Sequence, residues 1–298
     1  MTQQNTDSPR GLAFALSAYV MWGFLPLYMK ALSHIPAAEV IAHRVIWSVP
    51  VAGAVLIALR RTSELKAALH NPRMLIMAGV TALLISLNWG IYVWAIQHGH
   101  ALDAALGYYI NPLVSVFLGA TLLRERMNRA QIAAIALACC AVAVLTWEAG
   151  RLPVLALGMT ATFAAYGYFK KQLPIGPNQG FMLEVLILLP FALVYAIWVQ
   201  VSGHSHFLTG SFFNDWMLPL AGVVTAVPLI CYANGAKLLR LSTIGILQYV
   251  APTMIFLCAV FVFDEPFGTA RMVAFPMIWA ALAIYTYGMF RASRRRDS

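Results

Sequence analysis

The sequence predicts an all-α integral membrane protein with ten transmembrane helices, arranged as a 5+5 inverted structural repeat. Composition, the spacing of apolar runs and a repeated motif predict this class. Of 298 residues, 61% are hydrophobic and 10% are charged, and the mean hydropathy is +0.75. Soluble domains carry about 25% charged residues, so this chain has too few polar side chains to cover a globular surface. Soluble enzymes, secreted mini-domains and disordered chains are therefore excluded.

Ten apolar runs are long enough to cross a bilayer core, which takes about 20 residues per helix. No small-residue cleavage site follows the first run at short range, so we interpret this run as an uncleaved helix rather than a signal peptide. The predicted spans are 11–31, 39–59, 74–97, 103–123, 130–147, 152–170, 181–201, 216–236, 243–263 and 270–290.

Lysine and arginine residues orient these spans, because cytoplasmic loops carry an excess of positive charge. With the N-terminus inside, the outer segments hold three basic residues, Lys30, Arg151 and Arg271. The inner segments hold sixteen: Arg10, Arg60, Arg61, Lys66, Arg73, Arg124, Arg126, Arg129, Lys170, Lys171, Lys237, Arg240, Arg291, Arg294, Arg295 and Arg296. Both termini are therefore predicted to be cytoplasmic. The net charge of +9 then reflects membrane orientation rather than nucleic-acid binding.

The second half of the chain repeats part of the first at an offset of 140 residues. Both copies contain a Tyr-x-x-Pro motif, followed thirteen residues later by Glu. The aligned pairs are Tyr92 and Tyr232, Tyr109 and Tyr249, Pro112 and Pro252, Glu125 and Glu265, and Thr146 and Thr286. Five spans is an odd number, so the halves 1–149 and 150–298 enter the membrane from opposite sides. Inverted repeats are typical of secondary transporters, with the substrate site near the midplane between them.

A family resemblance is carried by two stretches, YYINPLVSVFLGATLLRERMNRAQIAAIALACCAVAVL and QYVAPTMIFLCAVFVFDEPFGTARMVAFPMIWAALAIY. They resemble the paired EamA domains of the drug/metabolite transporter (DMT) superfamily. The stretches EVIAHRVIWS, NWGIYVWAIQHGHALDAALGYYINPL and YGYFKKQLP are most similar to its RarD-like branch. The resemblance implies a central cavity lined mainly by helices 1, 3, 4, 6, 8 and 9. It also implies export or exchange of small metabolites, such as amino acids, across the bacterial inner membrane.

Polar and aromatic residues near mid-span are the candidate residues for binding a substrate in the central cavity. Asn88 and Tyr92 share one helix face, and Tyr108 and Asn111 share another. A buried amide must be paired or face a wet cavity, so Asn88 lines the cavity or forms an interhelical hydrogen bond. The full candidate set is Trp22, Asn88, Tyr92, Tyr108, Asn111, Tyr166, Tyr232, Gln248 and Tyr249.

Two further groups of residues are candidates for gating. Pro112 and Pro252 lie at matching depths near mid-span, where paired helix breaks point to a transport site, although prolines also simply bend packed helices. Glu39, His43 and Arg44 are ionisable residues within a span, which are rare. We interpret them either as a proton-coupling or gating group or as a structural ion pair at the entry of the helix.

Other notable side chains are interpreted as structural. Glu125 and Glu265 begin the connections into spans 130–147 and 270–290, where a helix dipole favours acidic groups as caps. Glu184 lies near two lysines and pairs with them at the interface. Tryptophans near span ends are membrane anchors, namely Trp147, Trp198 and Trp216. Two H-x-H pairs lie in outer loops, but no pattern joins them into a metal site, and no cofactor is expected; the pairs are His98 with His100 and His204 with His206.

These observations predict a secondary transporter that moves a small organic solute by alternating access. No Walker A pattern is present, so ATP does not drive it, and protons are one candidate coupling ion. A membrane enzyme would need motifs such as H-E-x-x-H or G-x-S-x-G, which the sequence lacks. A passive channel or a lipid-handling protein remains an alternative. The expected partners are the solute and the lipid bilayer.

Overall fold

Helices make up the regular secondary structure in the part of the chain that the structure describes. The computed structural model describes residues 8–122, 129–236, 238–239 and 247–294. Its helices are α1 (Pro9–Ala31), α2 (Ala37–Ala58), α3 (Thr62–Leu69), α4 (Pro72–Gln97), α5 (Ala101–Leu122), α6 (Arg129–Ala149), α7 (Val154–Gln172), α8 (Pro177–Val201), α9 (Phe212–Ala236), α11 (Val250–Phe261) and α12 (Thr269–Arg294).

Every predicted span coincides with a helix, although span 243–263 is represented only by the shorter α11. Within the described residues, seven helices are long and apolar enough to cross a membrane, namely α1, α2, α4, α6, α8, α9 and α12. The sequence analysis did not predict α3. This short helix lies in the basic segment 60–73, and it buries Ala68 against a cluster that includes Leu183 of α8. A segment of eight helical residues is too short to span.

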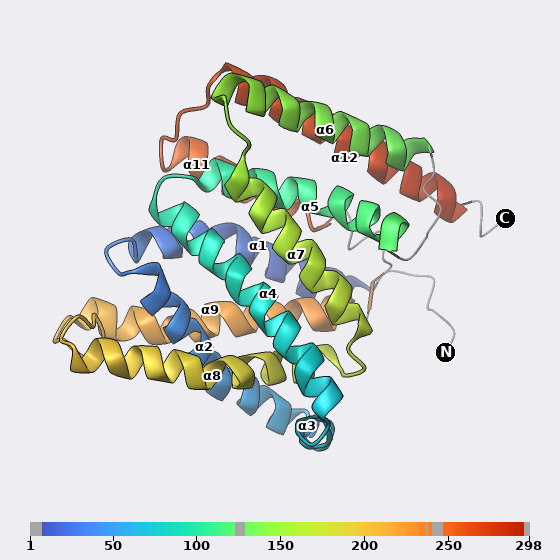
Figure 1. Cartoon of the computed structure of the whole chain (residues 1–298). Helices are drawn as coiled ribbons and strands as arrows, with labels where there is room; N and C mark the ends of the chain where they lie inside the picture. The colour runs from blue at the N-terminus through green and yellow to red at the C-terminus, as the bar shows by residue number, and fades with distance from the viewer. Residues whose placement is uncertain (1–7, 123–128, 237, 240–246, 295–298) are drawn as a thin grey trace.

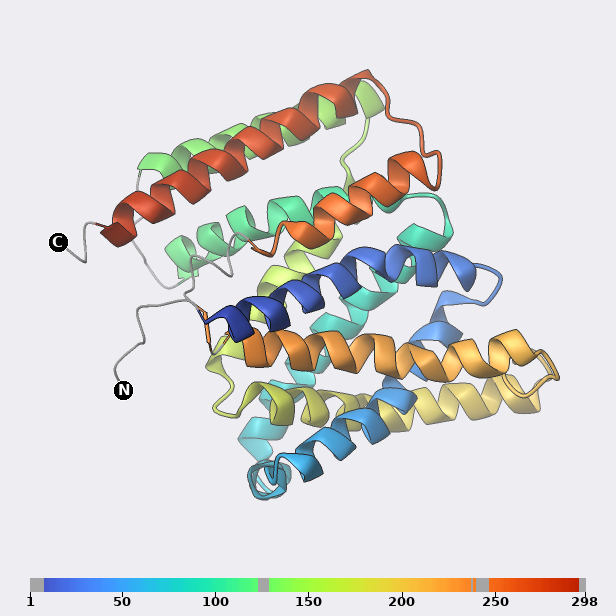
Figure 2. The ribbon, with the colours of Figure 1, turned by 180° about the vertical axis from the view of Figure 1, so that it is seen from behind.

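The connections between helices separate to two ends of the bundle (Figures 1 and 2). Segments 32–36, 98–100, 150–153, 202–211 and 262–268 lie at one end, which we call the loop end. The start of α1, the end of α12 and α3 lie at the other, which we call the terminal end. The basic residues of α3 and of the starts of α4 and α6 therefore gather at the terminal end.

Helix packing follows a pattern that recurs between the halves of the chain. In one set of contacts α7 packs against α4 and α5, and in another α1 packs against α9 and α11. α2 packs against α8 and α9, whereas α8 packs against α2 and α4. α6 and α12 pair with each other along one edge of the bundle (Figure 1). In chain order, α1, α2, α4, α5 and α6 of the first half correspond to α7, α8, α9, α11 and α12 of the second. When each helix is replaced by its counterpart, every one of these contacts becomes another contact of the set or stays the same.

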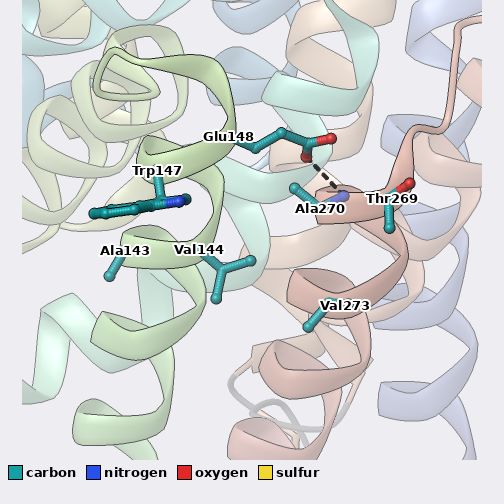
Figure 3. Close-up of a pocket in the computed structure, with 7 residues that line it drawn as sticks. All are labelled: Ala143, Val144, Trp147, Glu148, Thr269, Ala270 and Val273. Atoms are coloured by element: carbon teal, nitrogen blue, oxygen red, sulfur yellow. Dashed lines mark hydrogen bonds between the residues drawn. The ribbon is translucent and has the colours of Figure 1, made fainter.

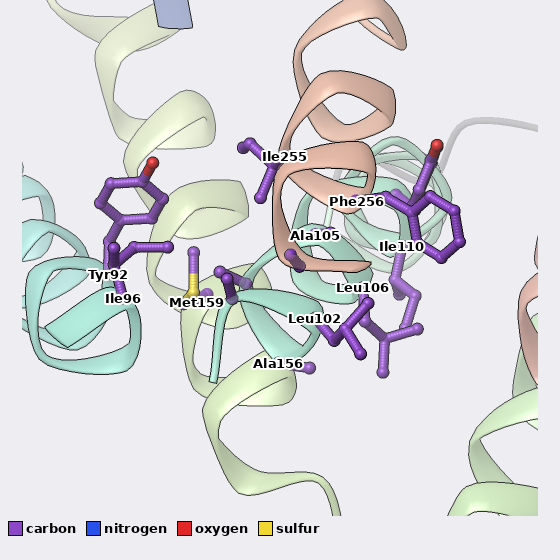
Figure 4. Packing of buried hydrophobic residues seen from close by; sticks show 14 of the residues in the cluster. Tyr92, Ile96, Leu102, Ala105, Leu106, Ile110, Ala156, Met159, Ile255 and Phe256 are labelled. Carbon is purple, nitrogen blue, oxygen red and sulfur yellow. The ribbon is translucent and has the colours of Figure 1, made fainter. Parts of the chain in front are cut away.

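The apolar core lies where α4, α5, α7 and α11 meet (Figure 4). Figure 4 shows side chains of all four helices in one cluster, among them Tyr92, Leu106, Met159 and Ile255. Helices approach closely where glycine removes the side chain, as is common in membrane bundles. A Cβ on Gly107 of α5 would lie 2.9 Å from the carbonyl oxygen of Ala156 on α7. This close α5–α7 contact brings the candidate residues of α5 next to α7.

Candidate substrate-binding site

A buried arginine lies at the centre of the predicted site region. Arg44 of α2 is 3% exposed, and its Nε donates a hydrogen bond of 3.0 Å to Oγ1 of Thr225 on α9. Its guanidinium carbon lies 4.6 Å from the ring centre of Trp89 on α4, a cation–π contact. Nη1 is buried and has no hydrogen-bond partner. Arg44 therefore joins α2, α4 and α9 while one of its donors stays unused.

Predicted residues on α4 and α5 surround this arginine. The phenols of Tyr92 and Tyr108, and that of Tyr28 on α1, lie within electrostatic range of the Arg44 guanidinium. The rings of Tyr92 and Tyr108 are 5.9 Å apart. The Tyr92 hydroxyl and Oδ1 of Asn111 are both buried without a partner. The structure thus brings Arg44 near two of the predicted cavity residues, Tyr92 and Tyr108, and Asn111 lies one turn after Tyr108 on α5.

Asn88 forms the interhelical hydrogen bond that one of its two interpretations predicts, whereas a role in lining a cavity stays a prediction. Its Nδ2 donates to the carbonyl oxygen of Met159 at 2.9 Å and to Oγ1 of Thr162 at 3.1 Å, which ties α4 to α7. Its Oδ1 is buried and has no partner. The amide therefore packs two helices together while it keeps one acceptor free. It lies one turn before Tyr92 and next to Trp89 on α4.

A line of aromatic rings continues from the Arg44 region towards α8. Tyr108 packs edge-on against Phe163 at 6.0 Å between ring centres, and Phe163 lies 6.0 Å from Tyr166. The Tyr166 hydroxyl donates to Oε2 of Glu184 at 3.3 Å, and Oε1 of Glu184 accepts from Nζ of Lys170 at 2.6 Å. The predicted pairing of Glu184 with the lysines is therefore confirmed for Lys170.

The remaining aromatic candidates form a separate group. Trp22 of α1 and Tyr232 of α9 lie 5.7 Å apart, and both contact Tyr19, which the sequence analysis did not single out. Tyr232 also lies within electrostatic range of Tyr166, which belongs to the line of rings. Gln248 and Tyr249 form a turn directly before α11, where the Tyr249 hydroxyl is buried without a partner.

The two prolines differ in their effect on the backbone. α5 runs continuously through Pro112, so the proline removes one hydrogen bond without breaking the helix. Pro252 lies in the first turn of α11, just after the turn at Gln248 and Tyr249. The helix is therefore not interrupted at Pro112, the position where the sequence predicts a mid-span break. Beside Pro252, the irregular backbone precedes the proline rather than coinciding with it.

Glu39 and His43 share a face of α2, but they do not form a pair in the structure. Glu39 accepts hydrogen bonds from the backbone nitrogen and Nδ1 of His206, at 2.7 and 2.8 Å, and a longer one from Ser205. His43 instead accepts a hydrogen bond from Nε1 of Trp47 at 3.2 Å, and its ring contacts Phe207. The loop 202–211 therefore supplies the partner that the sequence analysis sought within α2.

Two surface hollows lie away from these residues. One is a groove between α6 and α12 with a volume of about 530 Å³. Figure 3 shows the residues that line it, Ala143, Val144, Trp147, Glu148, Thr269, Ala270 and Val273. A second, on α8, is lined by apolar and aromatic residues such as Phe191 and Trp198. Trp147, Trp198 and Trp216 are 90%, 62% and 66% exposed, which suits outward-facing anchors. Neither hollow reaches the polar residues around Arg44.

Comparison with known proteins identifies the family. Residues 9–147 match the EamA-like transporter family. Protein RarD of Salmonella typhi is 40% identical over 287 residues, which cover 96% of this chain and 98% of that protein. Protein RarD of Escherichia coli K12 is 41% identical over 286 residues, covering 96% and 97% respectively. The chain belongs to the RarD-like branch of the EamA family, within the DMT superfamily. It is a multi-pass membrane protein of a transporter family.

The fold of this RarD-like chain also matches a solved crystal structure. The two superpose with a TM-score of 0.61 at 19% identity, covering 92% of this chain and 96% of the other. At this identity the likeness concerns the fold alone. It extends over both halves of the chain, whereas the match to the EamA family covers the first half.

The capping residues of this RarD-like chain correct one sequence prediction. Glu265 accepts from the backbone nitrogens of Ala101 and Leu102, at 2.6 and 2.9 Å, so it caps α5 rather than the helix that follows it in sequence. Glu148 caps α12 instead, through the nitrogen of Ala270 at 2.7 Å. Glu125 lies outside the described residues. Spacing along the chain favours the next helix, but packing brings a different N-terminus within reach.

The sequence analysis did not identify four residues that lie beside Arg44 or Glu39. Trp89 and Thr225 contact Arg44, Tyr28 lies within electrostatic range of it, and His206 binds Glu39. Trp89 and Tyr28 sit among many apolar residues, so nothing in the sequence distinguishes them from lipid-facing or core aromatics. His206 had a signal, since it belongs to an H-x-H pair. The sequence analysis weighed that pair only as a metal site.

Proposed function

We propose that this chain is a secondary transporter that exports or exchanges a small organic solute across the bacterial inner membrane by alternating access. The observation that carries the proposal is a set of buried polar atoms without partners on three neighbouring helices. They are Nη1 of Arg44, Oδ1 of Asn88, the hydroxyl of Tyr92 and Oδ1 of Asn111. Buried polar groups are normally hydrogen-bonded. A polar solute bound between these helices would satisfy them.

The packing pattern supports a ten-helix bundle built from two inverted repeats, residues 1–149 and 150–298. Helix contacts exchange when the halves are interchanged: α7 against α4 and α5 corresponds to α1 against α9 and α11. The sequence repeat at an offset of 140 residues agrees with this correspondence. Alternating access in such folds comes from one repeat moving against the other around a fixed site. Arg44 and Thr225 belong to different halves, so their contact lies at that boundary.

The predicted substrate residues fall into two groups, those proposed to touch the substrate and those proposed to line the pathway. Tyr92 and Tyr108 lie within electrostatic range of Arg44, Asn111 lies one turn after Tyr108 with a buried acceptor that has no partner, and we propose all three as direct substrate contacts. Asn88, Tyr166, Trp22, Tyr232, Gln248 and Tyr249 complete the proposed wall of the pathway. Aromatic rings with a polar atom suit an amphipathic organic solute.

Counterflow distinguishes a carrier from a passive channel or a lipid-handling protein. Proteoliposomes that contain the purified chain would be loaded with a bacterial metabolite extract and diluted into an isotope-labelled extract. A carrier is expected to accumulate particular labelled solutes transiently, with saturation and with stimulation by the same solute on the opposite side. Flux without saturation or counterflow would favour a channel. No flux of any solute would contradict transport.

We further propose that both termini are cytoplasmic, so that the terminal end of the bundle faces the cytoplasm. The basic residues of α3 and its neighbours support this orientation. After replacement of the native cysteines, Thr209→Cys in the exposed loop 202–211 should react with an impermeant thiol reagent added to intact cells. Ser63→Cys, exposed on α3, should react only after permeabilisation. The reverse result would invert the topology.

A further inference from the structure

Arg44 is a buried cation, and no carboxylate of the described part of the chain forms an ion pair with it. Its contacts are the hydroxyl of Thr225 and the ring face of Trp89, and both groups are neutral. The Thr225 hydroxyl donates its own hydrogen to the carbonyl oxygen of Ala221, which leaves it an acceptor for Arg44. Neutral groups do not cancel a full charge. A buried charge without a counter-ion is costly, so the site favours an anion.

The described carboxylates are engaged elsewhere. Glu39, one turn before Arg44 on α2, is bound by His206 and Ser205, and Glu184 is bound by Lys170 and Tyr166. Each of the other described carboxylates except Asp264 also has its own partner. The pairs are Glu64 with Gln179, Asp103 with His100 and Arg271, Glu148 with Ala270, Asp215 with Leu208, and Glu265 with Ala101 and Leu102. Asp264 is exposed in a loop. Within the described residues, none forms an ion pair with Arg44.

The surroundings of Arg44 suit an anion that carries an apolar body. Nη1 of Arg44 and the hydroxyl of Tyr92 are buried donors without partners. The rings of Trp89, Tyr92 and Tyr108 provide apolar faces around them. An arginine fork matches the two oxygens of a carboxylate, and Nη1 of Arg44 and the nearby Tyr92 hydroxyl are free donors of the kind that a carboxylate accepts from. The aromatic faces fit the organic part of the molecule.

The charge balance favours a monoanion over a phosphate dianion. Of the other cations in the spanning helices whose side chains the structure describes, Arg10 faces Phe14, Lys30 faces Phe263, Lys170 pairs with Glu184 and Arg271 pairs with Asp103. Arg73 and Arg129, at the starts of α4 and α6, are exposed. One guanidinium neutralises one carboxylate. A dianion would retain a negative charge in an apolar bundle, which is unfavourable.

We propose that Arg44 is the binding group for the carboxylate of the solute, so that this protein transports organic monocarboxylates with an apolar or aromatic body. The proposal rests on the proposed transport function, because it names the substrate class of that same site. Arg44 thereby changes from a gating candidate to a residue that touches the substrate.

A binding series with the purified full chain tests the headgroup. The probes are phenylacetate, its neutral amide phenylacetamide, the cation phenethylamine and phenyl phosphate, and the readout is the apparent Tm, because a ligand of the folded state raises it. Phenylacetate is expected to raise Tm with saturation, while the amide and the amine leave it unchanged. Equal stabilisation by the amide or the amine, stronger stabilisation by phenyl phosphate, or none by phenylacetate would overturn the proposal.

Variants assign the effect to Arg44. Arg44→Gln is expected to weaken phenylacetate binding at least about tenfold, and Arg44→Lys less, because lysine keeps the charge but not the fork. Arg151→Gln removes an exposed arginine from segment 150–153 and should bind as wild type. If Arg44→Gln fails to fold, Arg44→Lys decides, with a several-fold weakening expected. Wild-type affinity in the folded Arg44→Gln variant, or in Arg44→Lys when Arg44→Gln does not fold, would contradict the assignment.

The counterflow experiment separates this proposal from the proposed function. Mass spectrometry of the labelled solutes in proteoliposomes should identify compounds with a free carboxylate. If the accumulated solutes are amines or neutral molecules, the transporter stands and the carboxylate assignment is wrong. If no solute moves although phenylacetate binds through Arg44, transport fails while the anion site stands.

Discussion

Two buried carboxylates at opposite ends of the bundle perform different structural tasks. Glu39 begins α2 at the loop end, and Glu184 lies in the first part of α8, beside the end of α7. Each is 1% exposed. Glu184 binds Lys170 and Tyr166, which belong to the same half of the chain. Glu39 binds Ser205 and His206, which belong to the other half.

This difference separates contacts that hold one half together from contacts that must break if the halves move. The pairing of Glu184 with Lys170 links neighbouring helices and would persist while a repeat moves as a body. The contact of Glu39 with the loop 202–211 joins the halves, as do Glu265 with the start of α5 and Glu148 with the start of α12. These inter-half contacts gather at the loop end (Figure 2). The partner type differs too, since Glu39 is bound by a histidine and Glu184 by a lysine.

The largest effect on stability is expected at Glu184. Glu184→Gln would leave the ammonium of Lys170 without its counter-charge, 2.6 Å from the substituted side chain. Breaking such a pair costs about 3 kcal/mol, measurable as a lower apparent Tm in detergent. Glu64→Gln, the same substitution on exposed α3, should change Tm much less. Equal losses in both variants would show that burial does not distinguish these carboxylates.

Glu39→Gln should reduce stability less and transport more. The amide oxygen still accepts the backbone N–H of His206, so the expected loss is about 1 to 2 kcal/mol. If protons drive transport through Glu39, the variant loses uphill transport from a pH gradient but keeps solute exchange. His204→Gln, an exposed change in the same loop, is the control. Uphill transport by purified Glu39→Gln would assign coupling to another group or ion.

A smaller change is expected when Glu265 is neutralised. Glu265→Gln keeps one good acceptor for the two backbone nitrogens at the start of α5 and loses the charge that the helix dipole favours, which is worth about 1 kcal/mol. Asp264→Asn changes the exposed neighbour and should have no effect on Tm. A loss at Glu265 as large as that at Glu184 would make inter-half contacts as important for folding as contacts within a half.

Most of the helical architecture could be predicted from the sequence, because hydrocarbon forces every backbone polar group to pair within its own segment. An apolar run of about 20 residues in a membrane is therefore a helix before any neighbour is known. The same local rule explains the failure at α3, whose helix depends on contacts of Leu65 and Ala68 rather than on a long apolar run. Local reasoning also predicts a break at Pro112, because a proline disrupts an isolated helix, whereas α5 continues through this residue.

The sequence by itself determined the protein class, the positions of the helices, the family and the types of residue that a site could use. Only the tertiary structure decided which of those residues meet. Glu39 contacts a loop 166 and 167 residues away, Glu265 caps a helix 163 and 164 residues away, and Arg44 reaches Thr225 across 181 residues. Spacing along one helix reports only which side chains share a face. The partner of a buried charge depends on which other helix packs against that face.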